Sequence, residues 1–192
     1  MMSQAVGVLL AAGQSTRFGT HKLLQPLPDT QVPIALQAAR HLCQALPDSV
    51  AVIRNNDPQL HELLLQTGID VVINDDADNG MSTSIACGIH ASPHASSWIL
   101  ALSDMPYIAS TTINRVSQAL QEGALIAAPT YKDRRGHPVG FSHQLKHELL
   151  RLRGDRGAKA VVERHRDELV LIDVNDDGVL RDIDRPEDIT SR

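Results

Sequence analysis

Residues 10–22 combine glycines and cations, reading Leu-Ala-Ala-Gly-Gln-Ser-Thr-Arg-Phe-Gly-Thr-His-Lys. Gly13 and Gly19 allow the backbone to approach a ligand closely, and the amides between them can bind an anion. Arg17 and Lys22 are the only charged side chains among residues 1–28, so no acid close in the sequence offsets them. We therefore expect this segment to bind a triphosphate rather than to serve only as a tight turn.

Two familiar phosphate-binding motifs do not match this loop. A P-loop needs a lysine directly after its last glycine, whereas Gly19 is followed by Thr20 and His21. The dinucleotide fingerprint needs a second glycine two positions after the first, where this chain has Ser15. Neither motif accounts for the loop.

Short apolar runs alternate with segments of helical periodicity along the chain. The runs predict strands at residues 6–10, 50–53, 71–73, 98–102, 124–128 and 169–174. The periodic segments predict helices at residues 33–46, 58–66, 85–89, 111–121, 144–152 and 158–165. We also expect residues 82–84 to cap the third helix, a polar basic loop to follow residue 128, and residues 177–178 to form a turn between two strands. The alternation predicts an α/β fold, a three-layer Rossmann-like and mostly parallel sheet with helices on both faces, in a single domain over residues 1–192.

Ligands of such sheets bind at the carboxyl ends of the strands. The loops that follow strands are residues 13–22, 74–84 and 103–106, and we expect them to surround one site with the segment near residue 184. Asp104 stands just beyond the strand at 98–102, and Pro106 stops the chain from continuing there as a helix. An aspartate in this position can bind a cation or cap the following turn.

Composition and charge exclude several classes of protein. The chain has 192 residues, of which 42% are hydrophobic and 21% charged, as in ordinary globular proteins. The net charge of -5 argues against a general nucleic-acid partner. No apolar run approaches the ~20 residues that span a bilayer, so we expect a cytoplasmic protein without a membrane partner. Cys43 and Cys87 fall in apolar helical patterns and are expected to be buried, reduced thiols.

The loop at residues 10–22 resembles the first loop of the MobA-like nucleotidyltransferases. The pattern of that family, Leu-Ala-Ala/Gly-Gly-x-Ser-x-Arg-Met/Phe-Gly-x-x-Lys, matches the segment throughout. Five further blocks resemble the family in the same order, most closely the branch that makes molybdopterin cytosine dinucleotide: residues 80–84, 104–106, 136–138, 154–158 and 182–188. The resemblance implies an enzyme that moves the NMP part of an NTP onto a phosphorylated small molecule and releases pyrophosphate.

The resemblance also implies roles for individual residues. Arg17 and Lys22 would be catalytic and would stabilise the departing pyrophosphate. Asp104 would bind Mg²⁺ with Asp184 or Asp182, of which we favour Asp184. Several phosphate charges at short range need a hard divalent cation with oxygen ligands. The nucleotide would be bound by Leu10, Ala11, Ala12, Gly13, Ser15, Gly19, Gly80, Met81, Ser82 and Ser84.

The acceptor side is assigned to His137 and Asp155. His137 lies in a Gly-His-Pro turn beside Lys132, Arg134 and Arg135, which can meet an anionic acceptor, although an exposed basic loop without a ligand is the alternative. Family members with Leu-Ala-Ala-Gly tend to use CTP, so Ala12 indicates CTP. The matching blocks indicate molybdopterin as acceptor, with a molybdenum oxidoreductase as an implied partner. The alternatives are a cytidylyltransferase for a sugar or polyol phosphate and a nucleotide- or cofactor-binding carrier without catalysis.

Overall fold

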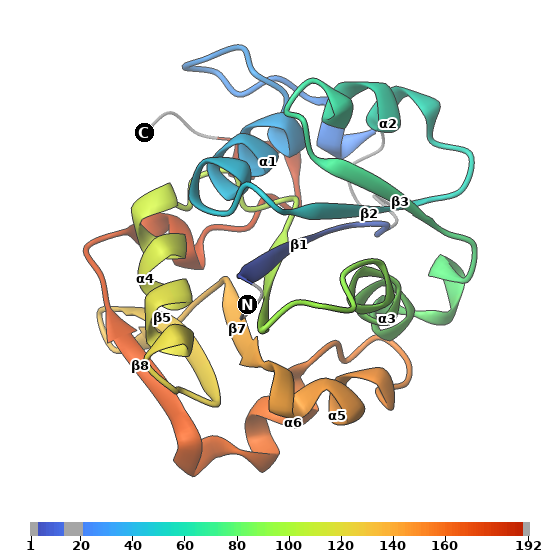
Figure 1. Cartoon of the computed structure of the whole chain (residues 1–192). Coiled ribbons are helices and arrows are strands. Elements are labelled where there is room, and N and C mark those ends of the chain that lie inside the picture. Colours follow the sequence, from blue (N-terminus) through green and yellow to red (C-terminus); the bar gives the residue numbers. More distant parts are fainter. Residues whose placement is uncertain (1–3, 14–20, 190–192) are drawn as a thin grey trace.

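The computed structural model describes residues 4–13 and 21–189. Within these ranges, eight strands form one sheet (Figure 1). They are β1 (Ala5–Ala11), β2 (Val50–Arg54), β3 (Asp70–Asn74), β4 (Ser97–Leu102), β5 (Ile126–Tyr131), β6 (Arg134–Arg135), β7 (Val139–Ser142) and β8 (Leu169–Asp173). The order is β3-β2-β1-β4-β7-β5-β6, and β8 pairs with β5 outside this path. The first four strands are parallel, as are β5 and β8, whereas β7 and β6 run antiparallel to their neighbours.

Helices cover both faces of the sheet (Figure 1). One face carries α1 (Ile34–Ala45), α2 (Pro58–Leu65) and α4 (Ser110–Gln121), and the other carries α3 (Met81–Ala91), α5 (Lys146–Leu150) and α6 (Lys159–Arg164). Strand β1 shows how the sequence divides the two cores, because successive side chains of a strand point to opposite faces. Leu9 packs into the first core, while Val8 and Leu10 pack into the second. The predicted three-layer α/β fold with a mostly parallel sheet is confirmed.

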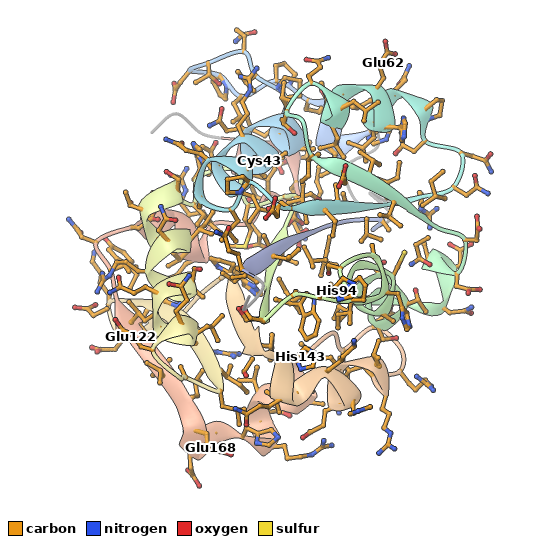
Figure 2. The ribbon with its side chains drawn as sticks, viewed as in Figure 1. Cys43, Glu62, His94, Glu122, His143 and Glu168 are labelled. Atoms are coloured by element: carbon orange, nitrogen blue, oxygen red, sulfur yellow. The ribbon has the colours of Figure 1, made fainter. Side chains whose placement is uncertain are left out.

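The predicted helices recur with shifts of up to about two residues at each end, except that the helix expected at residues 85–89 begins four residues earlier, as α3. The helix expected at residues 33–46 is α1, and Pro33 is its N-cap rather than its first helical residue. Within the described ranges, no helix has both the length and the apolar character needed to cross a bilayer. Cys43 on α1 (Figure 2) and Cys87 on α3 are free thiols, but both are half-buried rather than buried. Desolvation by burial raises the pKa of both thiols.

The prediction of a polar loop after residue 128 is wrong. Strand β5 extends to Tyr131, the basic segment contributes β6, and residues 139–142 form β7. β7 lies between β4 and β5 and pairs Phe141 with Trp98 on one side and with Ile126 on the other. Phe141 and Trp98 are fully buried. Residues 139–142 are too few to show a strand period in the sequence, and they form a strand because they are buried between β4 and β5.

Two expected turn assignments are also wrong. Helix α3 begins at Met81 with Gly80 as N-cap, so residues 82–84 lie inside the first turn instead of capping it. Residues 177–178 do not join two strands, because Asp177–Leu180 is a short 3₁₀ helix. The preceding Asp176 is buried and caps this 3₁₀ helix, since its Oδ1 accepts from the Gly178 N–H at 3.1 Å. Its Oδ2 accepts from the Ala109 N–H at 2.9 Å and from the Thr112 hydroxyl at 2.7 Å at the start of α4.

Candidate active site

The carboxyl ends of β1, β2, β3 and β4 surround a cavity of about 600 Å³. The turn after β1 contributes Ala12 and Gly13, and β2 contributes its last residue, Arg54. The cavity is also lined by Leu10, Lys22, Leu23, Ala77, Asp78, Met81, Ser84, Leu102, Ser103, Asp104, Asp155 and Asp184. The site is thus where the strand-end rule places it for a parallel sheet.

A lysine and two aspartates meet at one end of this cavity. The Lys22 ammonium donates to Asp104 Oδ2 at 2.9 Å and to Asp184 Oδ1 at 3.4 Å. Only 11% of the Lys22 side chain is exposed, against 25% of Asp104 and 44% of Asp184. A backbone hydrogen bond from Ile183 N–H to the Asp104 carbonyl, at 2.9 Å, holds the C-terminal segment beside β4. This bond explains how Asp184, 162 positions after Lys22 in the chain, reaches the same ammonium as Asp104.

The donor set at this point fits a hard divalent cation. Two carboxylates face the single positive charge of Lys22, and carboxylate oxygens are the ligands that Mg²⁺ and Mn²⁺ prefer. No group of three or more His, Cys, Asp or Glu side chains with metal-binding geometry occurs among residues 4–13 and 21–189. The protein would therefore supply two carboxylates, and substrate phosphates and water would complete the shell, as is usual for Mg²⁺. Asp182 is exposed and does not line the cavity.

The segment 80–84 is held in place from two sides. Buried Asn74, at the end of β3, donates to the hydroxyls of Thr83 at 2.9 Å and Ser84 at 3.0 Å. Gly80 has a φ of +103°, and a Cβ there would lie 2.5 Å from the carbonyl carbon of Gly154. Ser82 N–H donates to the Gly154 carbonyl at 3.1 Å. The blocks at 80–84 and 154–158, which are far apart in the sequence, are therefore one structural unit beside the cavity.

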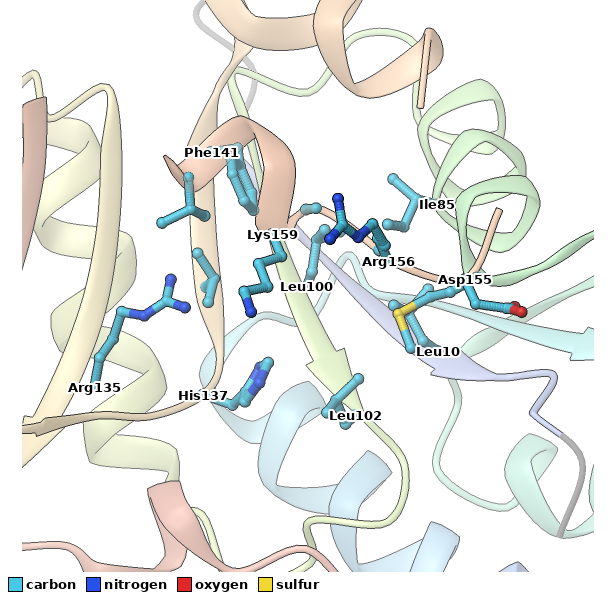
Figure 3. A pocket seen from close by; sticks show the side chains of 15 residues that line it. Leu10, Ile85, Leu100, Leu102, Arg135, His137, Phe141, Asp155, Arg156 and Lys159 are labelled. Carbon is cyan, nitrogen blue, oxygen red and sulfur yellow. The ribbon is translucent and has the colours of Figure 1, made fainter. Parts of the chain in front are cut away.

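A second cavity of about 260 Å³ adjoins the first and shares Leu10, Met81, Leu102 and Asp155 with it. Its apolar lining includes Ile85, Leu100, Val139, Phe141 and Val162, and its cations are Arg135, Arg156 and Lys159. Figure 3 shows Arg135, His137 and Lys159 directed into the same space. Burial, and after it the charge of Arg135, lowers the pKa of His137, so that its imidazole is neutral near pH 7.

The structure brings most of the expected site residues together. The large cavity is lined by Leu10, Ala12, Gly13, Lys22, Met81, Ser84, Asp104 and Asp184, the small one by His137, and both by Asp155. Ala11, Gly80 and Ser82 lie beside the cavity without lining it, and Asp182 lines neither cavity. The predicted roles of Arg17, Ser15 and Gly19 fall outside the described residues.

Sequence reasoning missed two groups of site residues. Arg54 lines the large cavity, but in the sequence it is one arginine after an apolar run. Arg156 and Lys159 line the small cavity and belong to or follow the block at 154–158, which is the signal that could have found them.

Comparison with known proteins gives consistent matches over nearly the whole chain. A family model described as the MobA-like NTP transferase domain matches residues 7–169. The chain is 26% identical over 194 residues to the purine catabolism protein PucB of Bacillus subtilis (strain 168), covering 95% of this chain and 93% of PucB. It is 27% identical over 190 residues to nicotine blue oxidoreductase of Paenarthrobacter nicotinovorans, covering 94% and 92%.

A solved structure of similar sequence and fold is that of Rv0371c from Mycobacterium tuberculosis H37Rv. The two chains superpose with a TM-score of 0.83 at 30% identity, covering 97% of this chain and 96% of that one. The same protein has been solved in complex with manganese, and that structure matches with a TM-score of 0.74 at 28% identity, covering 90% and 89%. A divalent cation is therefore present in a structure of a relative.

Proposed function

The chain belongs to the MobA-like NTP transferase family and is a nucleotidyltransferase, and from this premise we propose that it transfers CMP from CTP to molybdopterin and releases pyrophosphate. The metal in this proposal is Mg²⁺. The observation that carries the proposal is the meeting of Lys22, Asp104 and Asp184 in a cavity of about 600 Å³. A cavity of that size accommodates a nucleoside triphosphate, and the charges at its end suit a metal-bound phosphate chain.

Each charged group at that end has a distinct task. The acceptor phosphate, already ionised near neutral pH, attacks the α-phosphorus, and the bond from that phosphorus to the bridging oxygen of the β-phosphate breaks. Lys22 balances the charge that accumulates on the departing pyrophosphate. Asp104 and Asp184 would hold Mg²⁺, which when bound reduces the repulsion between the acceptor phosphate and the triphosphate. Asp184 is preferred to Asp182 because Asp184 shares the Lys22 ammonium with Asp104.

The second cavity supports a ring-bearing acceptor. It adjoins the large cavity and has an apolar lining that includes the fully buried Phe141. A polyol chain would lose hydrogen bonds to water against the apolar part of this lining, whereas the flat faces of a pterin ring can pack against it. Arg135 and Lys159 supply positive charge for an anionic acceptor, and His137 and Asp155 supply hydrogen bonds. The choice of CTP rests on Ala12, which lines the large cavity of about 600 Å³, called the nucleotide cavity from here on.

The test is a transfer assay with separated substrates. The purified protein is incubated with Mg²⁺, molybdopterin and each of CTP, GTP, ATP and UTP, and pyrophosphate release is measured. Release with CTP is expected, and its loss in Asp104→Ala is expected because the metal loses a ligand. A carrier without catalysis, or an oxidoreductase as the name of one relative states, would release no pyrophosphate.

Two further arms separate the remaining alternatives. Release with a polyol phosphate but not with molybdopterin would overturn the acceptor in favour of the sugar- or polyol-phosphate cytidylyltransferase. Asp184→Asn and Asp182→Asn form a matched pair: the first is expected to lose Mn²⁺ binding and turnover, and the second to retain both. The reverse result would assign the metal to Asp182.

A further inference from the structure

Arg54 joins two turns across the nucleotide cavity. It is the last residue of β2, and its Nε donates to the Ala12 carbonyl at 3.3 Å. Its Nη2 pairs with Asp78 Oδ1 at 2.7 Å. Its side chain is 29% exposed, so the guanidinium is partly shielded from water, whereas Asp78 is largely exposed. All three residues line the cavity.

The position of Arg54 in the sheet separates it from the end of the cavity where Lys22, Asp104 and Asp184 meet. Asp104 follows β4 and Arg54 ends β2, with β1 lying between these strands. Two strand spacings are about 10 Å, which is the scale of the distance from a triphosphate to its nucleobase. Arg54 thus lies on the side where a base would extend when the phosphates are at Lys22.

The Ala12 carbonyl accepts a hydrogen bond from Arg54. The pairing of β1 with β2 ends at Ala11 and Ile53, so Ala12 lies just beyond the ladder. A carbonyl oxygen has two acceptor sites, and a hydrogen bond from Arg54 leaves the second available to a ligand. Asp78 places a carboxylate at the other end of the same guanidinium. The two ends of the bridge are therefore oxygen atoms, those of the Ala12 carbonyl and the Asp78 carboxylate. Such acceptors attract the exocyclic amino group of cytosine and repel the carbonyl that uracil has in the same position.

We propose that Arg54 is a positioning residue for the nucleobase: by bridging Ala12 and Asp78 it holds two acceptors at the base end of the cavity and so sets the base preference of the enzyme. This inference rests on the proposed nucleotidyl transfer. Its distinguishing consequence is that Arg54 acts on the base and not on the phosphates.

The experiment compares Arg54→Ala, Arg54→Lys and Asp78→Asn with the wild type and with Arg40→Ala, an exposed residue of α1 that lines neither cavity. We measure kcat and KM for the four NTPs, and binding of CMP, UMP and inorganic triphosphate by calorimetry. In Arg54→Ala, KM for CTP is expected to rise about tenfold with kcat within about twofold, since a hydrogen bond to a charged group is lost outside the reacting atoms. The preference for CTP over UTP and the binding of CMP are expected to fall, while triphosphate binding stays unchanged.

The other variants provide the controls. Arg54→Lys is expected to recover thermal stability but not base preference, because an ammonium cannot reproduce the two-ended contact of a guanidinium. Asp78→Asn is expected to lower the preference less than Arg54→Ala, since the bond to Ala12 remains. The inference would be overturned if Arg54→Ala lost activity equally with all four NTPs and bound triphosphate more weakly. It would also be overturned if Arg54→Ala kept the same preference for CTP over UTP as Arg40→Ala. If the wild type releases no pyrophosphate with any NTP, the proposed function fails, and the CMP and UMP binding arm still decides the role of Arg54.

Discussion

Replacing Lys22 by methionine tests how the protein handles its metal. The Lys22 ammonium contacts both carboxylates that we propose as metal ligands, at 2.9 and 3.4 Å. A divalent cation at those oxygens would meet a like charge at short range, so the free protein should bind metal weakly until a triphosphate draws Lys22 away. Methionine keeps most of the apolar stem and removes the charge. Lys22→Met is therefore expected to bind metal more tightly in the absence of nucleotide.

The size of the gain follows from the geometry. Two unit charges 4 Å apart interact by about 1 kcal/mol in water and about 4 kcal/mol at an effective dielectric constant of 20. Lys22 is 11% exposed, which places the pair between these limits, and the double charge of the metal increases the repulsion that is relieved. The gain should therefore be at least about tenfold in affinity, or about 1.4 kcal/mol.

The assay is Mn²⁺ binding without nucleotide, followed by electron paramagnetic resonance. Lys132→Met is the matched control, because Lys132 lies over the Tyr131 ring and lines neither cavity. Turnover with CTP is expected to fall in Lys22→Met while Mn²⁺ affinity rises, and a misfolded variant could not produce these opposite changes. Unchanged or weaker Mn²⁺ binding would refute the idea that lysine and metal compete for the two carboxylates.

Three further predictions concern the framework of the site. Gly80→Ala should destabilise the fold by about 1–3 kcal/mol in urea titration, since its φ is positive and the new Cβ would press on Gly154; a change under about 0.5 kcal/mol would contradict the strain. Asp176→Ala should cost about 1–2 kcal/mol through loss of the N-cap of the 3₁₀ helix 177–180 and of the hydrogen bonds to Ala109 and Thr112, with an unchanged unfolding midpoint as the opposing result. Hydrogen bonds to Glu168 and then Glu148 raise the pKa of His165, so its stabilisation is complete below about pH 6.5 and is lost as the pH rises through the higher folded-state value. His165→Gln should therefore flatten the dependence of Tm on pH above about 6.5. A profile parallel to that of the wild type would exclude the hydrogen bonds of His165 as the cause.

The parts of the fold that could be predicted are those whose local pattern matches their final burial. Residues 5–11 are buried on both faces of the sheet, and a continuous apolar run is what such a strand requires. Strand β7 could not be predicted in this way, because its four residues include Gly140 and carry no period long enough to recognise. Its conformation is fixed by β4 and β5 on either side.

The cap of α3 could not be predicted for a different reason. Serines and threonine before an apolar run indicate an N-cap, but the hydroxyls of Thr83 and Ser84 accept from Asn74 of β3 instead. Gly80 can begin the helix one turn earlier because it alone tolerates the positive φ and the contact with Gly154. A tertiary contact thus displaced the local preference.

The difference between Asp104 and Arg54 shows which site residues a sequence can reveal. Asp104 could be identified because the metal-binding role proposed for it requires a carboxylate just beyond a buried strand, and the strand itself is visible in the sequence. Arg54 also ends a strand, but its partners Ala12 and Asp78 lie 42 and 24 residues away in other turns. Only the order β3-β2-β1-β4 brings those turns together. A proposed metal ligand is therefore recognisable from its residue type and its position after a strand. A residue proposed to position the nucleobase is not, because its contacts depend on which strands become neighbours, and base preference is the property that such a residue would control.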